Sequence, residues 1–176
     1  MTKLNRANLP SLKSGIAVPA YQASDLKPGI LHFGLGNFHR AHQAVYLDAL
    51  FKMGRSRDWG IIGTGVRPAD RAMHDALKPQ DWLTTVVEQE ANVSRARVTG
   101  AMLGMIPPED RAAIVRQLAD PAIRIVSITV TEGGYFIDPA TGQFNPELPE
   151  IAADGTNPSD PQTVFGLIAL GLKRRR

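Results

Sequence analysis

A short apolar run that leads straight into two closely spaced glycines constrains the fold of this 176-residue chain more than any other feature. Residues 30–33 (Ile-Leu-His-Phe) continue into Gly34-x-Gly36, and an apolar pattern of helical period follows over residues 38–50. Strand, glycine turn and helix in this order are typical of α/β folds that present backbone N–H groups to a phosphate. Gly34 would permit the tight turn, and Gly36 would let the main chain approach a pyrophosphate without a side chain in the way.

The rest of the chain alternates between strand and helix patterns, which predicts a Rossmann-like α/β fold with a mostly parallel sheet flanked by helices. Residues 123–130 carry the strongest strand pattern, and such a β-branched run predicts a central strand buried on both faces. A long loop is expected over 138–158, after which Asp160 would cap the last helix with Pro161 at its first position. The expected strands are 29–34, 58–63, 82–88, 93–105 (as a possible hairpin with 82–88) and 123–130, and the expected helices are 38–53, 68–77, 110–119 and 163–172. We therefore predict an N-terminal arm over 1–27 and a dinucleotide-binding domain over 28–176.

Composition excludes several classes of function. Hydrophobic residues make up 43% of the chain and charged residues 21%, which is typical of a globular domain. The absence of cysteine excludes disulfides and thiolate metal sites. The net charge of +3 is small, and three of the basic residues are the arginines at 174–176. The charge therefore does not indicate a nucleic-acid partner. No apolar stretch reaches the roughly 18 residues of a membrane span, so we expect no membrane partner and a cytoplasmic location.

His39 stands where the usual fingerprint has its third glycine, and His42 follows it at helical spacing. The two side chains would share one face of a helix, which raises the question of a metal site. No carboxylate, cysteine or third histidine accompanies them at ligand spacing, so we predict no metal site. Packing or hydrogen bonding behind the glycine turn is the preferred interpretation.

The glycine turn alone leaves a nucleotide site and a purely structural turn about equally open. An acidic residue after the second strand normally holds the ribose hydroxyls, and Asp70 is the best candidate here. Its spacing is longer than usual, which is explained if the turn at 63–67 lies beside the first turn. The alternative for Asp70 is a carboxylate that only serves the start of a helix.

Several motifs, taken together, resemble the long-chain mannitol dehydrogenase family. They are residues 34–43 (GLGNFHRAHQ), 59–65 (WGIIGTG), 124–127 (RIVS), 129–135 (TVTEGGY) and Pro161 with 163–166 (TVFG), and they occur in the family's order. Members of that family are NAD(P)-dependent oxidoreductases of polyols and hexonates. The resemblance covers essentially the whole chain and implies mannitol–fructose interconversion by hydride transfer, or a fructuronate or tagaturonate reduction.

The resemblance also implies which residues bind the cofactor. Asp70 would hold the ribose, and a carboxylate there favours NAD because it repels the extra phosphate of NADP. Arg67 lies close in sequence, so NADP is not excluded. Glu132 has the alternative of a solvated loop carboxylate. The full set is Gly34, Gly36, Asn37 and Phe38 on the pyrophosphate side, with Phe38 as a pocket wall or core residue, Arg67 and Asp70 at the ribose, and Thr131, Glu132 and Gly133 near the nicotinamide.

No catalytic acid or base is assigned in this chain. The resemblance implies a lysine with asparagine and histidine partners on a second, helical domain, and neither these nor the family's Val-Asp-Arg-Ile signature is present. We expect the chain to be the cofactor-binding portion of such an enzyme and inactive alone. A polyol or ketose would be its substrate only with that domain supplied. A stand-alone NAD(H)-binding or partner-binding module is the alternative, and a remnant that does not fold is the third.

Overall fold

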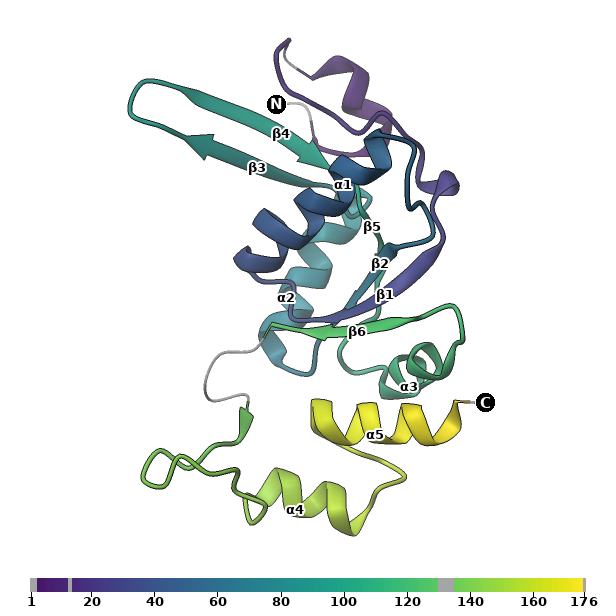
Figure 1. Ribbon diagram of the computed structural model, residues 1–176, viewed down its shortest axis with the longest axis vertical. Helices are drawn as coiled ribbons and strands as arrows, with labels where there is room; N and C mark the ends of the chain where they lie inside the picture. The colour runs from purple at the N-terminus through teal and green to yellow at the C-terminus, as the bar shows by residue number, and fades with distance from the viewer. Residues whose placement is uncertain (1–2, 13, 130–134, 176) are drawn as a thin grey trace.

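A four-stranded parallel sheet forms the centre of the computed structural model, which describes residues 3–12, 14–129 and 135–175 (Figure 1). Its strand order is β5-β2-β1-β6, and β1 therefore lies in the interior of the sheet. The strands are β1 (Pro28–Phe33), β2 (Gly60–Thr64), β5 (Met102–Met105) and β6 (Ile125–Ile128). In the register, Leu31 of β1 pairs with Ile62 on one side and with Val126 on the other. The predicted Rossmann-like fold with a parallel sheet is confirmed.

Helices cover both faces of this sheet. Successive residues of β1 point to opposite faces, so the strand contributes apolar side chains to a core on each side. On one face, Ile30 packs in a core with Phe51 of α1 (Ala44–Lys52) and Leu77 of α2 (Pro68–Leu77). On the other face, Leu31 and Phe33 pack with α3 (Arg111–Ala119) and α5 (Val164–Arg174). Figure 1 shows α3 and α5 side by side below the sheet, with α1 and α2 across it.

The strand predicted over 93–105 is two strands that belong to different sheets. β3 (Thr84–Gln89) and β4 (Ser94–Thr99) form the expected antiparallel hairpin, which projects from the body in Figure 1. The chain then turns at Gly100, whose N–H donates to Asp48, and β5 runs parallel to β2. The apolar pattern continues through this turn because both strands contribute to the core, so it hides the change of sheet.

The described part of residues 123–130 does not form the predicted central strand. Within the described residues, β6 pairs with β1 alone and lies at an edge of the sheet. Ile125 is 44% exposed there. A β-branched run indicates that a strand can be buried on both faces. Which strands lie beside it is decided by the crossover through α3.

The loop predicted over 138–158 contains the helix α4 (Pro149–Thr156). The predicted cap of the last helix was also wrong, because Thr163 and not Asp160 is the N-cap of α5 and accepts from the N–H of Gly166. The carboxylate of Asp154 in α4 accepts from the N–H and hydroxyl of Thr163 at 3.0 and 2.5 Å. A tertiary contact therefore selects the helix start.

The predicted arm over 1–27 is mainly irregular but is packed onto the domain. It contains two short 3₁₀ helices, η1 (Arg6–Ser11) and η2 (Ala23–Asp25), and a third, η4 (Lys78–Gln80), follows α2. Tyr21 is buried in the core, and its hydroxyl donates to Asp48 at 2.5 Å. Burial, together with the hydrogen bond to Asp48, raises the pKa of Tyr21 far above its ordinary value. The arm therefore contributes to the core beside α1.

Candidate functional site

The glycine turn after β1 combines a strained position with an open one. Gly34 has φ +92°, and a Cβ there would lie 2.7 Å from the carbonyl oxygen of Thr129. Both facts restrict the position to glycine. A Cβ on Gly36 would meet no atom of the described residues within 4 Å, so they leave space above Gly36 for a ligand. The N–H of Gly34 donates to the carbonyl of Thr64 at 3.0 Å, which confirms that the turn after β2 lies beside the first one.

The helix after the turn begins at Asn37 and passes through a π-helical turn, η3 (His39–Gln43), before α1. The N–H groups of its first turn have no acceptor within the helix. The Arg40 side chain reaches back to the start of the helix, where it donates to the side-chain oxygen of Asn37 at 2.6 Å and to the carbonyl of Gly36 at 3.4 Å. Sequence reasoning gave Arg40 no role. A cation in the first turn of a helix is unfavourable for the dipole, and that was the available signal.

Phe38 is 66% exposed, and its ring lies 4.8 Å from that of His42. Of its two predicted roles, core residue and pocket wall, the structure excludes the first. The expectation that His39 and His42 share a helical face was also wrong. The π turn has more than four residues per turn, so His39 is buried while His42 is exposed.

His39 does lie behind the turn as expected, against a second histidine that sequence reasoning left without a role. The ring of His32 in β1 stacks on it with centroids 4.2 Å apart. Burial lowers the pKa of His32 to about 3 and that of His39 to about 4, so both rings are neutral at pH 7. A polar residue inside the apolar run of residues 30–33 was the signal for His32.

Asp70 lies at the second turn with a structural contact already made. Its Oδ2 atom accepts from the N–H groups of Val66 and Arg67 at 3.1 and 2.9 Å, which caps α2. The Arg67 guanidinium lies 3.7 Å from the same oxygen. A Cβ on Gly65 would overlap the carboxylate, so glycine is needed there for Asp70 to approach. Asp70 therefore does cap the start of α2, as the alternative predicted, and only its Oδ2 atom takes part in the capping bonds.

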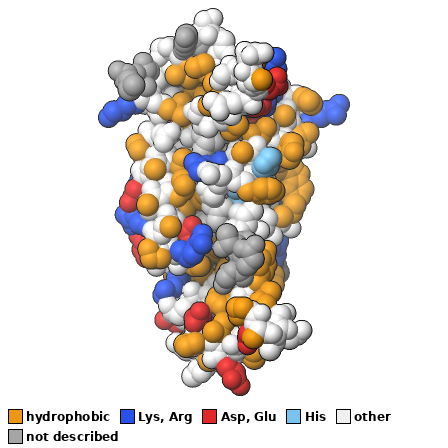
Figure 2. All heavy atoms as spheres, turned by 90° about the vertical axis from the view of Figure 1, so that its left-hand side faces the viewer, with side chains coloured by type: hydrophobic (Ala, Val, Ile, Leu, Met, Phe, Trp, Pro, Cys, Tyr) orange, Lys and Arg blue, Asp and Glu red, His pale blue; other side chains and the backbone are white. Residues whose placement is uncertain are grey.

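The turns after β1 and β2 meet at the carboxyl ends of the strands, where open α/β sheets bind their ligands. Figure 2 shows this end of the molecule, with charges of both signs scattered among apolar side chains. Thr131, Glu132 and Gly133 lie outside the described residues. Among the residues that are described, no cluster of three potential metal ligands occurs, and no helix is long and apolar enough to cross a membrane.

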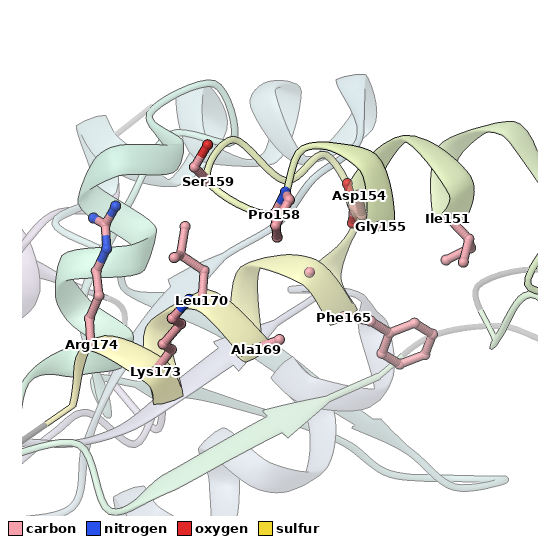
Figure 3. Close-up of a pocket in the computed structure, with 11 residues that line it drawn as sticks. Ile151, Asp154, Gly155, Pro158, Ser159, Phe165, Ala169, Leu170, Lys173 and Arg174 are labelled. Atoms are coloured by element: carbon pink, nitrogen blue, oxygen red, sulfur yellow. The ribbon is translucent and has the colours of Figure 1, made fainter.

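A separate groove of about 740 Å³ lies between α4 and α5 (Figure 3). Its lining is mainly apolar, with Phe165 and Ile151 toward one end and Lys173 and Arg174 toward the other. Its lining residues all lie between Ile151 and Arg174, so the groove includes neither glycine turn. We therefore place the candidate site at the turns and not in this groove.

The profile of the mannitol dehydrogenase Rossmann domain matches residues 28–176. The chain belongs to the mannitol dehydrogenase family. It is 54% identical over 159 residues to a mannitol 2-dehydrogenase of Cereibacter sphaeroides, covering 90% of this chain and 33% of the relative. A polyol:NADP oxidoreductase of Gluconobacter oxydans is 42% identical over 177 residues, which is 98% of this chain and 36% of that protein.

The fold agrees closely with a solved member of the mannitol dehydrogenase family. The mannitol 2-dehydrogenase of Pseudomonas fluorescens, in a ternary complex with NAD and D-mannitol, superposes with a TM-score of 0.94 at 46% identity. The match covers 99% of this chain and 36% of that one. This chain thus spans about a third of the length of the relatives it matches.

Proposed function

We propose that this chain is the NAD-binding portion of a polyol oxidoreductase similar to mannitol 2-dehydrogenase. The observation that carries the proposal is the open space above Gly36, at the start of a helix, in a domain that closely resembles an enzyme solved with NAD and D-mannitol. Bound NAD would supply the hydride acceptor for the interconversion of mannitol and fructose. The residues of this chain would bind and orient the cofactor.

The glycine turn fits a pyrophosphate in three respects. Gly36 leaves room for close approach, and the first-turn N–H groups from Asn37 onward carry partial positive charge. The Arg40 guanidinium adds a full charge at the same place. Phe38, exposed beside them, would form a wall of the pocket.

Asp70 and Arg67 would decide between NAD and NADP. The capping bonds of Asp70 use Oδ2, which leaves Oδ1 to accept from the ribose hydroxyls. Arg67 is close enough to pair with a 2′-phosphate instead. The similarity to a polyol:NADP oxidoreductase supports a preference for NAD that does not exclude NADP. The placement of Thr131, Glu132 and Gly133 near the nicotinamide, the 1–27 and 28–176 domain boundaries, and a cytoplasmic location remain predictions.

Titration calorimetry with NADH and NADPH tests the binding proposal directly. We expect NADH to bind more tightly, and we expect Asp70→Asn to reduce that preference. The asparagine keeps an oxygen for the capping bonds but loses the charge that repels the phosphate. Asp75→Asn is the matched control, because Asp75 is an exposed carboxylate of the same helix that pairs with Arg71. A folded chain that binds neither nucleotide would contradict the proposal.

The oxidoreductase proposal needs the rest of the enzyme. We would fuse this chain to the remaining two-thirds of the Cereibacter sphaeroides relative and measure NADH-dependent reduction of fructose. Fructuronate and tagaturonate as substrates test the hexuronate alternative. We expect fructose reduction by the fusion and none by the chain alone. Nucleotide binding without any reduction by the fusion would favour a stand-alone NAD(H)-binding module.

A further inference from the structure

A chain of partly buried hydrogen bonds connects the π turn to the glycine turn. Its four members are His39 and Gln43 of η3, Ser127 of β6 and His32 of β1, and we name them the histidine brace. The brace ends on the carbonyl oxygen of Gly34, which lies 3.0 Å from Nε2 of His32. None of the proposed cofactor contacts uses these side chains.

The proton positions along the brace follow from its end. Nε2 of His32 has two neighbours, the Gly34 carbonyl at 3.0 Å and the Thr129 hydroxyl at 3.1 Å. The carbonyl only accepts, and the hydroxyl already donates its single proton to that carbonyl. Both neighbours are therefore acceptors toward the ring, so Nε2 of His32 carries the proton and donates. In a neutral imidazole the other nitrogen then accepts. The Ser127 hydroxyl, 2.8 Å from Nδ1 of His32, is therefore the donor to that ring.

The same logic extends to the far end. Since the Ser127 hydroxyl proton is used on His32, its oxygen accepts from the amide NH₂ of Gln43 at 3.2 Å. The side-chain oxygen of Gln43 then accepts from Nδ1–H of His39 at 2.8 Å. Every bond in the brace runs in one direction, and each histidine has one defined tautomer.

Both rings must stay neutral for this pattern, because a protonated imidazole donates from both nitrogens. Burial lowers the pKa of each histidine well below 6.5. The neighbouring His39 ring lowers the pKa of His32 further, and the Arg40 charge lowers that of His39 further. Protonation of His32 would turn its Nδ1 into a donor that faces the donating Ser127 hydroxyl. Protonation of His39 would leave an Nε2–H group buried without an acceptor among the described residues.

His39 leaves one polar atom unpaired in the core. Its Nε2 is buried without a hydrogen-bond partner in the described part of the chain. Such an atom is a cost to the fold, which an apolar side chain of similar size would avoid. The role of an imidazole at position 39 therefore lies in Nδ1–H, which orients Gln43.

We propose that the histidine brace is a positioning device that fixes the peptide plane between Gly34 and Leu35 in the nucleotide-binding turn. Thr129 donates to the same carbonyl at 2.7 Å and secures it from the end of β6. The peptide is trans, so holding the oxygen toward β6 turns the N–H of Leu35 the opposite way. The inference rests on the proposed function, since it assigns the brace to that site.

Nitrogen NMR of the imidazoles and NADH calorimetry test the inference together. In the wild-type chain at pH 7 we expect His32 as the Nε2–H tautomer and His39 as the Nδ1–H tautomer. Ser127→Ala leaves Nδ1 of His32 without its donor, so the nitrogen shift of Nδ1 should change while the Nε2–H tautomer stays. The ring is then held from one side only, and the NADH dissociation constant should rise about tenfold or more. Ser127→Thr keeps the hydroxyl and should restore both readouts. Gln43→Met breaks the brace from the helix side and serves if Ser127→Ala does not fold.

Thr99→Val is the matched control. It removes a buried hydroxyl that bonds Thr84 at 2.7 Å, away from the turn. This variant should lose stability but keep the wild-type affinity and tautomers. Unchanged affinity in folded Ser127→Ala and Gln43→Met, or His32 found as the Nδ1–H tautomer, overturns the inference and leaves the proposed function intact. A folded wild-type chain that binds neither NADH nor NADPH overturns both.

Discussion

Gly34 and Gly36 are two residues apart, yet the fold constrains them differently. Gly34 is needed by the chain itself, because of its positive φ and the nearby Thr129 carbonyl. Gly36 has no atom near the position of a Cβ, so nothing in the described fold requires glycine there. The proposed approach of a nucleotide to the main chain would require it.

Substitution by alanine should separate these roles. We expect Gly34→Ala to lower the free energy of unfolding by roughly 2–4 kcal/mol, from backbone strain and overlap with Thr129. Gly36→Ala should leave that free energy within about 1 kcal/mol of wild type and weaken NADH binding. Urea denaturation and calorimetry measure the two effects. Equal losses of stability in the two variants would show that Gly36 is structural as well.

The buried histidines should make stability depend on pH. Their folded pKa values lie below 6.5, so the unfolded chain binds more protons and the free energy of unfolding falls as the pH drops from about 6.5 toward 4. Above that window both states are neutral and the contribution is constant. Between pH 7 and pH 5 we expect a loss of roughly 2 kcal/mol for each histidine. Urea denaturation at several pH values should show about half of this loss removed in His39→Gln, and an unchanged pH slope would contradict it.

At the scale of elements, the start of α5 shows a helix boundary set by a side chain from elsewhere. Asp154 reaches from α4 to the N–H groups of Gln162 and Thr163, at 2.5 and 3.0 Å. A Cβ on Gly166 would overlap its carboxylate. The contact therefore joins α4 to α5 and helps to define where α5 begins.

Asp154→Ala should lower the free energy of unfolding by about 1–3 kcal/mol, because it leaves buried N–H groups without an acceptor. Asp160→Ala is the control, since the sequence pattern favoured that residue as the cap. We expect Asp160→Ala to change stability by less than about 0.5 kcal/mol. Thermal and urea denaturation measure both, and a larger loss in Asp160→Ala would return the cap to that residue.

At the scale of the whole molecule, the proposed nucleotide binding would stabilise the folded state. A ligand that binds only the folded state adds about 2.7 kcal/mol at a concentration of 100 times its dissociation constant. For a domain of this size we expect NADH at that level to raise the melting temperature by roughly 5–10 °C. Differential scanning fluorimetry measures the shift, with Gly36→Ala as the control that should show less protection. No shift in the wild-type chain would contradict nucleotide binding.

The sequence by itself determined the local structure wherever neighbouring residues decide the outcome. The strand–turn–helix unit at residues 28–52, the hairpin and the helix over 68–77 depend on period, glycine and proline, which act over a few residues. The family also followed from the sequence, because its motifs are short and ordered, and the profile match confirms it.

Only the tertiary structure decided which residues meet across the chain. The edge position of β6, the split of 93–105 between two sheets and the cap from Asp154 all depend on contacts between distant residues. The histidine brace is the sharpest case, because it joins Gln43 to Ser127, which are 84 residues apart. Periodicity carries no information on such pairs. A buried polar side chain takes whichever partner the packed fold places within hydrogen-bond distance, since leaving it unpaired costs more.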